Sequence, residues 1–153
     1  MTVDVKFHRI ALIAAIIGAL DSLYLSWVKI INSQVFCGTS GQCETVNNSR
    51  YSEISGIPIA YLGLGAYLVI LAFLYIETRS SFWKENSPLA IFGISLVGVI
   101  YSAYLTYIEI AVLHAICPYC VVSALVMLCL FIISIFRLLQ VQTGSKPIPR
   151  RGG

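Results

Sequence analysis

Four apolar segments dominate this sequence, each close to the roughly 20 residues that an α-helix needs to cross a bilayer. They cover residues 9–31, 57–76, 88–113 and 118–136. Only 11% of the residues are charged and 58% are hydrophobic, whereas soluble domains carry about 25% charged residues. The sequence therefore predicts an all-α integral membrane protein, a bundle of four transmembrane helices.

The ends of the segments carry helix-boundary signals. Pro58, Pro88 and Pro118 stand at segment starts, where the missing N–H costs nothing. From Gln140 onward the sequence is polar and contains proline and glycine. We expect one membrane domain over residues 1–136 and a disordered cytoplasmic tail over 137–153.

The distribution of lysine and arginine predicts the orientation. With a cytoplasmic N-terminus, eight of the ten basic residues lie inside and only Lys29 and Arg50 lie outside, as the positive-inside rule requires. Four spans place both termini in the cytoplasm. The four cysteines of the loops then face outward from the cell membrane, where disulfides persist.

The connection over residues 32–56 is long enough to be functional. It carries Cys37, Cys43 and Ser49, and a short helix around 43–54 is plausible. A weak internal repeat with an offset of 80 residues relates 22–30 to 102–110, which is either chance or two like-oriented helices that each deliver a cysteine to one membrane face.

Cys117, Pro118 and Cys120 form a Cys-x-x-Cys motif where the fourth segment begins. A helix N-terminus favours a thiolate, and Pro118 suits a first helical turn. Half of a zinc site is the alternative. The wider Cys37/Cys43 spacing is unusual for zinc, so we favour redox chemistry and expect no metal.

Two outward cysteine pairs suggest a relay in which one pair takes electrons from an external dithiol and the other passes them on. Thiol–disulfide exchange requires the pairs to meet. Because the second pair borders the bilayer, the acceptor must be lipid-soluble, and a quinone takes the two electrons and two protons that a dithiol releases. Cys129, deep in the fourth segment, is expected to be a small buried hydrophobe.

Other candidates are less specific. Asp21 and Glu109 are acids inside apolar segments, and each is either functional or a structural polar contact. His114 could stabilise a thiolate or move protons, or merely mark the interface. Tyr61 and Tyr104 belong to a set of tyrosines that could line a flat-ring pocket or form an interfacial belt.

Over residues 10–136 the sequence resembles the bacterial and archaeal branch of the vitamin K epoxide reductase family. The motifs that carry this resemblance are Cys37-x5-Cys43-x5-Ser49, Gly56-Ile57-Pro58, Tyr104-Leu105, Glu109 and His114-Ala115-Ile116-Cys117-Pro118-Tyr119-Cys120.

The resemblance implies a four-helix bundle around a quinone of the menaquinone, ubiquinone or vitamin K type, capped by the first loop. It implies oxidation of a thioredoxin-like (DsbA-like) protein that introduces disulfides into secreted proteins. By this analogy Cys37 meets the partner, Cys43 exchanges with Cys117, and Cys120 lies nearest the quinone. Ser49 corresponds to the loop serine of the family.

Two departures bear on function. Many bacterial members carry a fused thioredoxin-like domain, whereas this chain ends soon after the fourth segment, so a separate partner is expected. Animal members have a tyrosine four residues after the motif, where this chain has Ala124. Reduction of vitamin K quinone or its epoxide is therefore the alternative activity. A metal-binding membrane protein using the four cysteines and a purely structural subunit are the alternatives of a different class; no nucleic-acid partner is expected.

Overall fold

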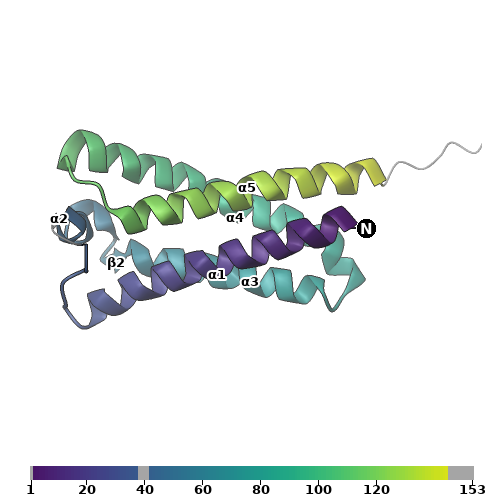
Figure 1. The fold of residues 1–153 in the computed structure, drawn as a ribbon, viewed down its shortest axis with the longest axis horizontal. Coiled ribbons are helices and arrows are strands. Elements are labelled where there is room, and N and C mark those ends of the chain that lie inside the picture. The colour runs from purple at the N-terminus through teal and green to yellow at the C-terminus, as the bar shows by residue number, and fades with distance from the viewer. Residues whose placement is uncertain (1, 38–41, 145–153) are drawn as a thin grey trace, which may run out of the picture.

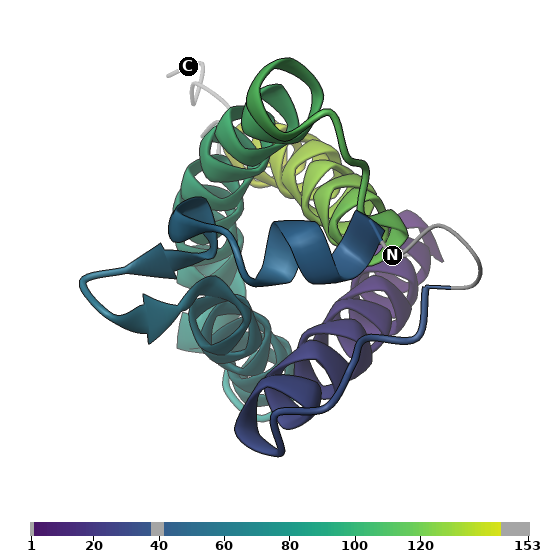
Figure 2. The ribbon, with the colours of Figure 1, turned by 90° about the vertical axis from the view of Figure 1, so that its left-hand side faces the viewer.

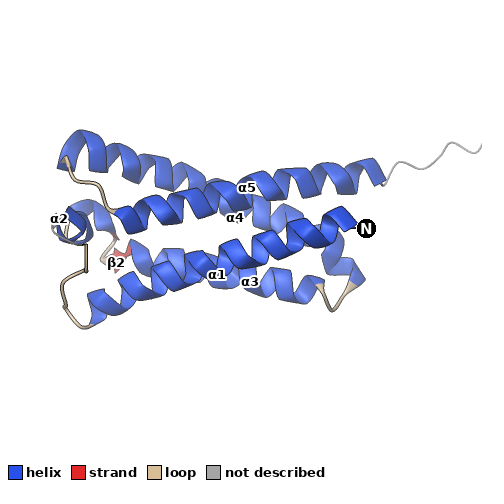
Figure 3. Ribbon diagram, viewed as in Figure 1, coloured by secondary structure: helices blue, strands red, loops and turns tan. Residues whose placement is uncertain are grey.

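The computed structural model describes residues 2–37 and 42–144 of the 153-residue chain. Almost all of this part is helical (Figure 3). In chain order the elements are α1 (Thr2–Ile30), α2 (Gln42–Asn47), the 3-10 turn η2 (Arg50–Ser52), β1 (Glu53–Ile54), β2 (Ile57–Pro58), α3 (Ile59–Glu77), α4 (Ser81–Ile108), the π-helical turn η3 (Glu109–Leu113) and α5 (Pro118–Gly144).

The long helices α1, α3, α4 and α5 lie side by side in one bundle (Figure 1). α1 packs against α3 and α5, and α4 packs against the same two helices, so α1 and α4 lie diagonally across the bundle (Figure 2). All four are long and apolar enough to cross a membrane, over Val5–Ile30, Ile59–Glu77, Asn86–Leu113 and Pro118–Val141. The predicted fold class is confirmed: the chain is an all-helical, multi-pass membrane protein.

The bundle core lies between the helices and is made of side chains from all four of them. It contains Ala11, Ala15, Tyr67, Ile70, Leu74, Ile91, Met127, Leu130 and Ile133, with Cys129 packed against it. Cys129 thus packs as a small apolar side chain, but it is half-buried rather than buried as expected. Many large apolar side chains point outward instead, for example Leu20, Leu125 and Val97, and lipid is the medium in which such a surface is stable.

The two ends of the bundle differ. The start of α1 and the end of α5 lie at one end, and α2 lies at the other, where it crosses the opening of the bundle (Figures 1 and 2). α1 and α4 both run toward the α2 end, so the two repeated segments are indeed like-oriented and each leads to a cysteine. Both cysteine pairs therefore gather at the end opposite the described ends of α1 and α5.

Three boundaries differ from expectation. Pro88 does not start a helix, because α4 begins at Ser81 and contains Pro88. The polar residues that precede the apolar run form the first turns of this helix. The loop helix ends at Asn47 rather than 54, since Glu53–Ile54 pairs with Ile57–Pro58 in an antiparallel hairpin. The predicted tail begins too early, because α5 runs to Gly144; residues 145–153 lie outside the described residues.

At the end away from the cysteines, a buried ion pair joins α3 to α5. Arg137 donates a hydrogen bond to Glu77, and both residues are about one-twentieth exposed, at 6% and 5%. His8 of α1 lies with its Nδ1 3.9 Å from the other carboxylate oxygen of Glu77. Arg137, assigned above to a disordered tail, is therefore part of the bundle.

Candidate active site

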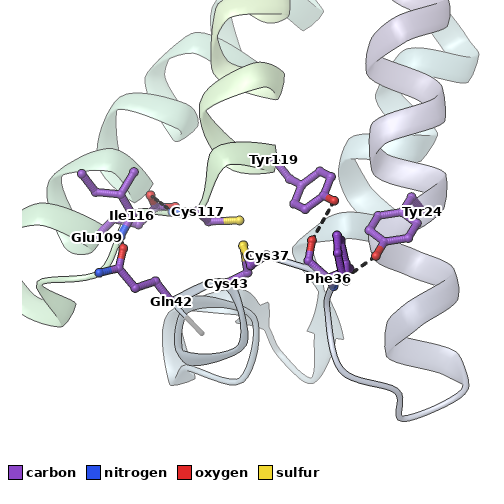
Figure 4. The surroundings of a disulfide bond; sticks show 9 residues. All are labelled: Tyr24, Phe36, Cys37, Gln42, Cys43, Glu109, Ile116, Cys117 and Tyr119. Carbon is purple, nitrogen blue, oxygen red and sulfur yellow. Dashed lines mark hydrogen bonds between the residues drawn. A yellow bond between two sulfur atoms is a disulfide. The ribbon is translucent and has the colours of Figure 1, made fainter. Parts of the chain in front are cut away.

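Cys37 and Cys43 form a disulfide, with their Cα atoms 5.9 Å apart. Cys117 and Cys120 are free thiols. All four cysteines belong to one apolar cluster, built on the buried side chains of Val28, Val35, Cys43, Val46, Ala115 and Cys117. The sulfur of Cys117 points toward the loop disulfide (Figure 4). The structure thus brings together the two pairs that the sequence predicts to meet.

The N-terminus of α5 presents Cys117. Pro118 is the first helical residue, as predicted, and the Val121 N–H donates to the Cys117 carbonyl at 3.1 Å. Cys117 therefore occupies the cap position, where helix N–H groups favour a negative charge. A hydrogen bond from the Cys120 thiol lowers the pKa of Cys117, and N–H groups of Cys120 and Tyr119 act in the same direction, against burial and the nearby Glu109 carboxylate. The cap position and this hydrogen bond both favour the thiolate form of Cys117.

The backbone just before α5 is held by two side chains from other elements. The Cys117 N–H donates to Glu109 Oε2 at 3.2 Å, and the Ile116 N–H donates to Gln42 Oε1 at 3.3 Å. The η3 turn that carries Glu109 ends at His114, whose backbone is left-handed at φ 48°. His114 is exposed, and its position marks the chain reversal between η3 and the Cys-x-x-Cys motif.

The loop that carries Cys43 is anchored on α1. Lys29 Nζ donates to the Asn47 carbonyl at 2.8 Å and lies 3.3 Å from the carboxylate of Glu53. Ser49 Oγ donates to the Val46 carbonyl at 2.7 Å and Ser52 Oγ donates to that of Asn47 at 2.7 Å, so both serines terminate α2. These bonds hold α2 across the end of the bundle, and Cys43, a residue of α2, is fully buried there.

A cavity of about 660 Å³ lies inside the bundle at the end that α2 covers. This volume falls within the range of roughly 300–1,000 Å³ typical of small-molecule sites. Its walls are mainly apolar, and Cys117 and Cys120 border it. The polar side chains on its wall are Asp21, Ser22, Asn47, Ser49, Tyr51, Ser52, Tyr101, Ser102, Thr106, Glu109 and Ser123.

Two carboxyl groups face this cavity from diagonally opposite helices. Asp21 Oδ2 and Glu109 Oε1 are buried atoms with no hydrogen-bond partner among the described residues. Glu109 is only 3% exposed, and an unpaired buried oxygen is costly. A quinone oxygen would accept a hydrogen bond from the protonated form of either carboxyl group, and a hydroquinone hydroxyl would donate one to the ionised form, so these residues fit a quinone.

Two apolar side chains of the cavity wall, one from α3 and one from α4, are also accessible. Leu62 of α3 and Val97 of α4 both line the cavity, and they are also 46% and 67% exposed. Both residues belong to the spanning segments Ile59–Glu77 and Asn86–Leu113, so this part of the wall lies at the depth of the bilayer.

The remaining candidate site residues fall into two groups, those that line the cavity and those that do not. Asp21, Ser49 and Glu109 line the cavity, whereas the described lining does not include Tyr61, Tyr104 or His114. The tyrosines on the wall are Tyr101, which belongs to the set of tyrosines considered from the sequence, and Tyr51, which does not. Within residues 2–37 and 42–144, no group of three or more histidine, cysteine and acidic side chains is placed to hold a metal ion.

Sequence reasoning missed the residues that tie the loop to the motif: Tyr24, Phe36, Gln42 and Tyr119. Phe36 and Tyr119 adjoin the cysteines in the sequence, which was the signal available.

Comparison with known proteins now adds to this geometry. A sequence model of the vitamin K epoxide reductase family matches residues 9–135. The chain belongs to this family. It is also 36% identical over 123 residues to the thiol-disulfide oxidoreductase LTO1 of Arabidopsis thaliana, a match that covers 76% of this chain and 32% of that protein. The chain thus spans about a third of the length of that relative. The matched region of this vitamin K epoxide reductase family member includes both cysteine pairs and the cavity.

Proposed function

We propose that this protein is a quinone-dependent thiol–disulfide oxidoreductase that supports disulfide formation outside the cytoplasm. The observation that carries the proposal is the gathering of the two cysteine pairs in one apolar cluster, together with the cavity that Cys117 and Cys120 border. Membership of the family and the name of the Arabidopsis relative support the thiol chemistry.

The loop pair receives the electrons. A dithiol of a thioredoxin-like protein reduces the Cys37–Cys43 disulfide, and the partner becomes a disulfide. The Cys43 thiolate then attacks the Cys117 sulfur of an oxidised Cys117–Cys120 pair, which releases the Cys120 thiolate. Attack of Cys37 on Cys43 breaks this mixed disulfide and releases Cys117. The closed loop disulfide and free Cys117 and Cys120 thiols correspond to the state after this exchange.

The second pair delivers the electrons to the cavity. A quinone of the menaquinone, ubiquinone or vitamin K type would accept two electrons and two protons there as Cys117 and Cys120 close to a disulfide. Glu109 accepts a hydrogen bond from the Cys117 N–H and so fixes the first turn of α5. Its other oxygen, and that of Asp21, can orient a ring oxygen or hold a proton at the cavity wall.

The charge asymmetry of the sequence supports a cell-membrane orientation with both termini cytoplasmic. The cysteine end would then face the oxidising side, where a thioredoxin-like protein can reach Cys37. Reduction of vitamin K quinone or its epoxide remains the alternative; assays with menaquinone and with vitamin K epoxide as acceptor separate the two. Stoichiometric zinc that survives dialysis of the reduced protein, without quinone turnover, would favour the metal-binding class.

The testing experiment separates the roles of the pairs. Quinone absorbance is followed with a reduced thioredoxin-like protein or with dithiothreitol as the electron donor. Cys37→Ala and Cys43→Ala should lose turnover with the protein dithiol but keep part of it with dithiothreitol, which is small enough to reach Cys117 and Cys120 directly. Cys117→Ala and Cys120→Ala should lose both.

The matched control is Cys129→Ala, which lies about 13 Å deeper than Cys120 at 1.5 Å per residue and should keep both activities. If the loop variants are equally inactive with both donors, a relay is wrong and the four cysteines act as one centre.

A further inference from the structure

The main chain of Phe36 is bonded on both sides by tyrosine hydroxyl groups. Its N–H donates to the hydroxyl oxygen of Tyr24 at 3.2 Å, and its carbonyl accepts from the hydroxyl of Tyr119 at 3.0 Å. The two rings also contact one another, with centroids 5.2 Å apart (Figure 4). The side chain of Phe36 is 80% exposed, so its main chain rather than its side chain is what holds this residue, next to the buried Val35.

The position of these three residues in the sequence matters. Phe36 directly precedes Cys37, and Tyr119 lies between Cys117 and Cys120. Tyr24 comes from α1, one face of which supports the same apolar cluster. The residue that holds the backbone next to the first loop cysteine is therefore part of the Cys-x-x-Cys motif itself.

We propose that Tyr24 and Tyr119 form a tyrosine clamp, a pair of positioning residues that seats Cys37 beside Cys43 and Cys117. The clamp acts on the residue directly before Cys37, whereas earlier in the segment the Ser33 N–H donates to the Val28 carbonyl of α1 at 3.2 Å. The clamp raises the effective concentration of the Cys37 thiol near Cys43, and so favours closure of the loop disulfide. That the clamp serves a relay to a partner dithiol rests on the proposed function; the positioning itself does not.

The size of the effect follows from the bonds. Each is a neutral hydrogen bond, and losing one shifts an equilibrium by about fivefold. Tyr119→Phe and Tyr24→Phe each remove one hydroxyl but keep the ring contact between the two side chains. Either variant should make the loop disulfide about fivefold easier to reduce.

The experiment is a redox titration of the full chain in detergent with glutathione. Cys117→Ala and Cys120→Ala are introduced together, so that the loop pair is the one redox-active pair left and Cys129 reports on folding. In this background the value of [GSH]²/[GSSG] at half-reduction should fall about fivefold in Tyr119→Phe and in Tyr24→Phe. Tyr107→Phe is the control and should leave the midpoint unchanged. Tyr107 lies near the end of α4, at the same end of the bundle as the clamp, and is 66% exposed.

Alkylation of Cys129 separates positioning from loosening of the bundle. The proposal holds if the midpoint falls while Cys129 stays as protected as in the parent protein. It is overturned if neither tyrosine variant moves the midpoint, if Tyr107→Phe moves it equally, or if the shift occurs only together with exposure of Cys129. The titration contains no quinone and no partner protein, so loss of the proposed enzymatic function would not change its outcome.

Discussion

The buried pair Glu77–Arg137 should be worth more to stability than any exposed ion pair of the chain. Removing one partner of a buried pair leaves the other charge without compensation, at a cost of about 3–5 kcal/mol. Glu77 and Arg137 meet this condition, because both are almost fully buried. We therefore expect Glu77→Gln or Arg137→Met alone to lower the free energy of unfolding by about 3 kcal/mol or more, and the double variant to recover most of that loss.

The magnitude can be compared within the same molecule. Lys29 and Glu53 form an ion pair at 3.3 Å, but the Glu53 side chain is 42% exposed. Exposed pairs contribute about 0–1 kcal/mol, so Glu53→Gln is the matched control. At roughly 2–4 °C per kcal/mol, Glu77→Gln should lower Tm by at least about 6 °C and Glu53→Gln by no more than about 4 °C.

The assay uses Cys129 as an internal probe. In a Cys117→Ala/Cys120→Ala background with the loop disulfide closed, Cys129 is the remaining free thiol of the five cysteines, and it packs against the core. A dye that fluoresces on reaction with thiols then reports unfolding on heating in detergent. A double variant as unstable as either single one, or a Glu77→Gln loss no larger than that of Glu53→Gln, would refute the reasoning.

Three further predictions follow from the site and its setting. Because the pKa of Cys117 is lowered, its alkylation should be half-maximal below the ordinary thiol value of about 8.5; Cys120→Ala removes the main cause, so the midpoint should rise and alkylation at pH 7 should slow. A midpoint unmoved by this change would contradict the assignment. Membrane-impermeant thiol reagents should label reduced Cys37 on intact cells. If labelling requires permeabilised cells, the cysteines face the cytoplasm and the proposed orientation is wrong. Gly18→Ala places a methyl group against the buried Tyr67 ring and should cost about 1–3 kcal/mol, whereas Gly65→Ala, which meets nothing within 4 Å, should leave Tm unchanged or higher.

Local sequence features predicted the fold well where one residue type decides the outcome. Apolar runs placed all four spans, and Pro118 marked the start of α5, because span length and a missing N–H are properties of short stretches. The same logic failed at Pro88. There the polar residues from Ser81 onward form a helical extension that the hydropathy of the segment does not reveal.

The part of the site that follows from residue type alone was predictable. Four cysteines and two intramembrane acids were identified by type, and Asp21 and Glu109 do line the cavity. The contacts that fix the loop were not predictable, because they join backbone groups to side chains far away in the sequence. Tyr119 and Phe36 are 83 residues apart, and Gln42 and Ile116 are 74 apart. Nothing in a tyrosine or a glutamine signals which distant main-chain group it will bond.

The part of the cavity wall formed by Leu62 and Val97 lies within the spanning segments of α3 and α4, so under the proposed function the bilayer is the reservoir from which the cavity fills. For a lipid-soluble acceptor, the supply then depends on the number of acceptor molecules per lipid in the plane of the membrane, not on their concentration in the whole sample. Adding acceptor-free lipid to fused proteoliposomes would slow filling at a constant total amount of acceptor, whereas adding buffer would not. The two substrates would thus arrive through separate media, the dithiol from water over α2 and the acceptor sideways through lipid, and neither would have to leave before the other could enter.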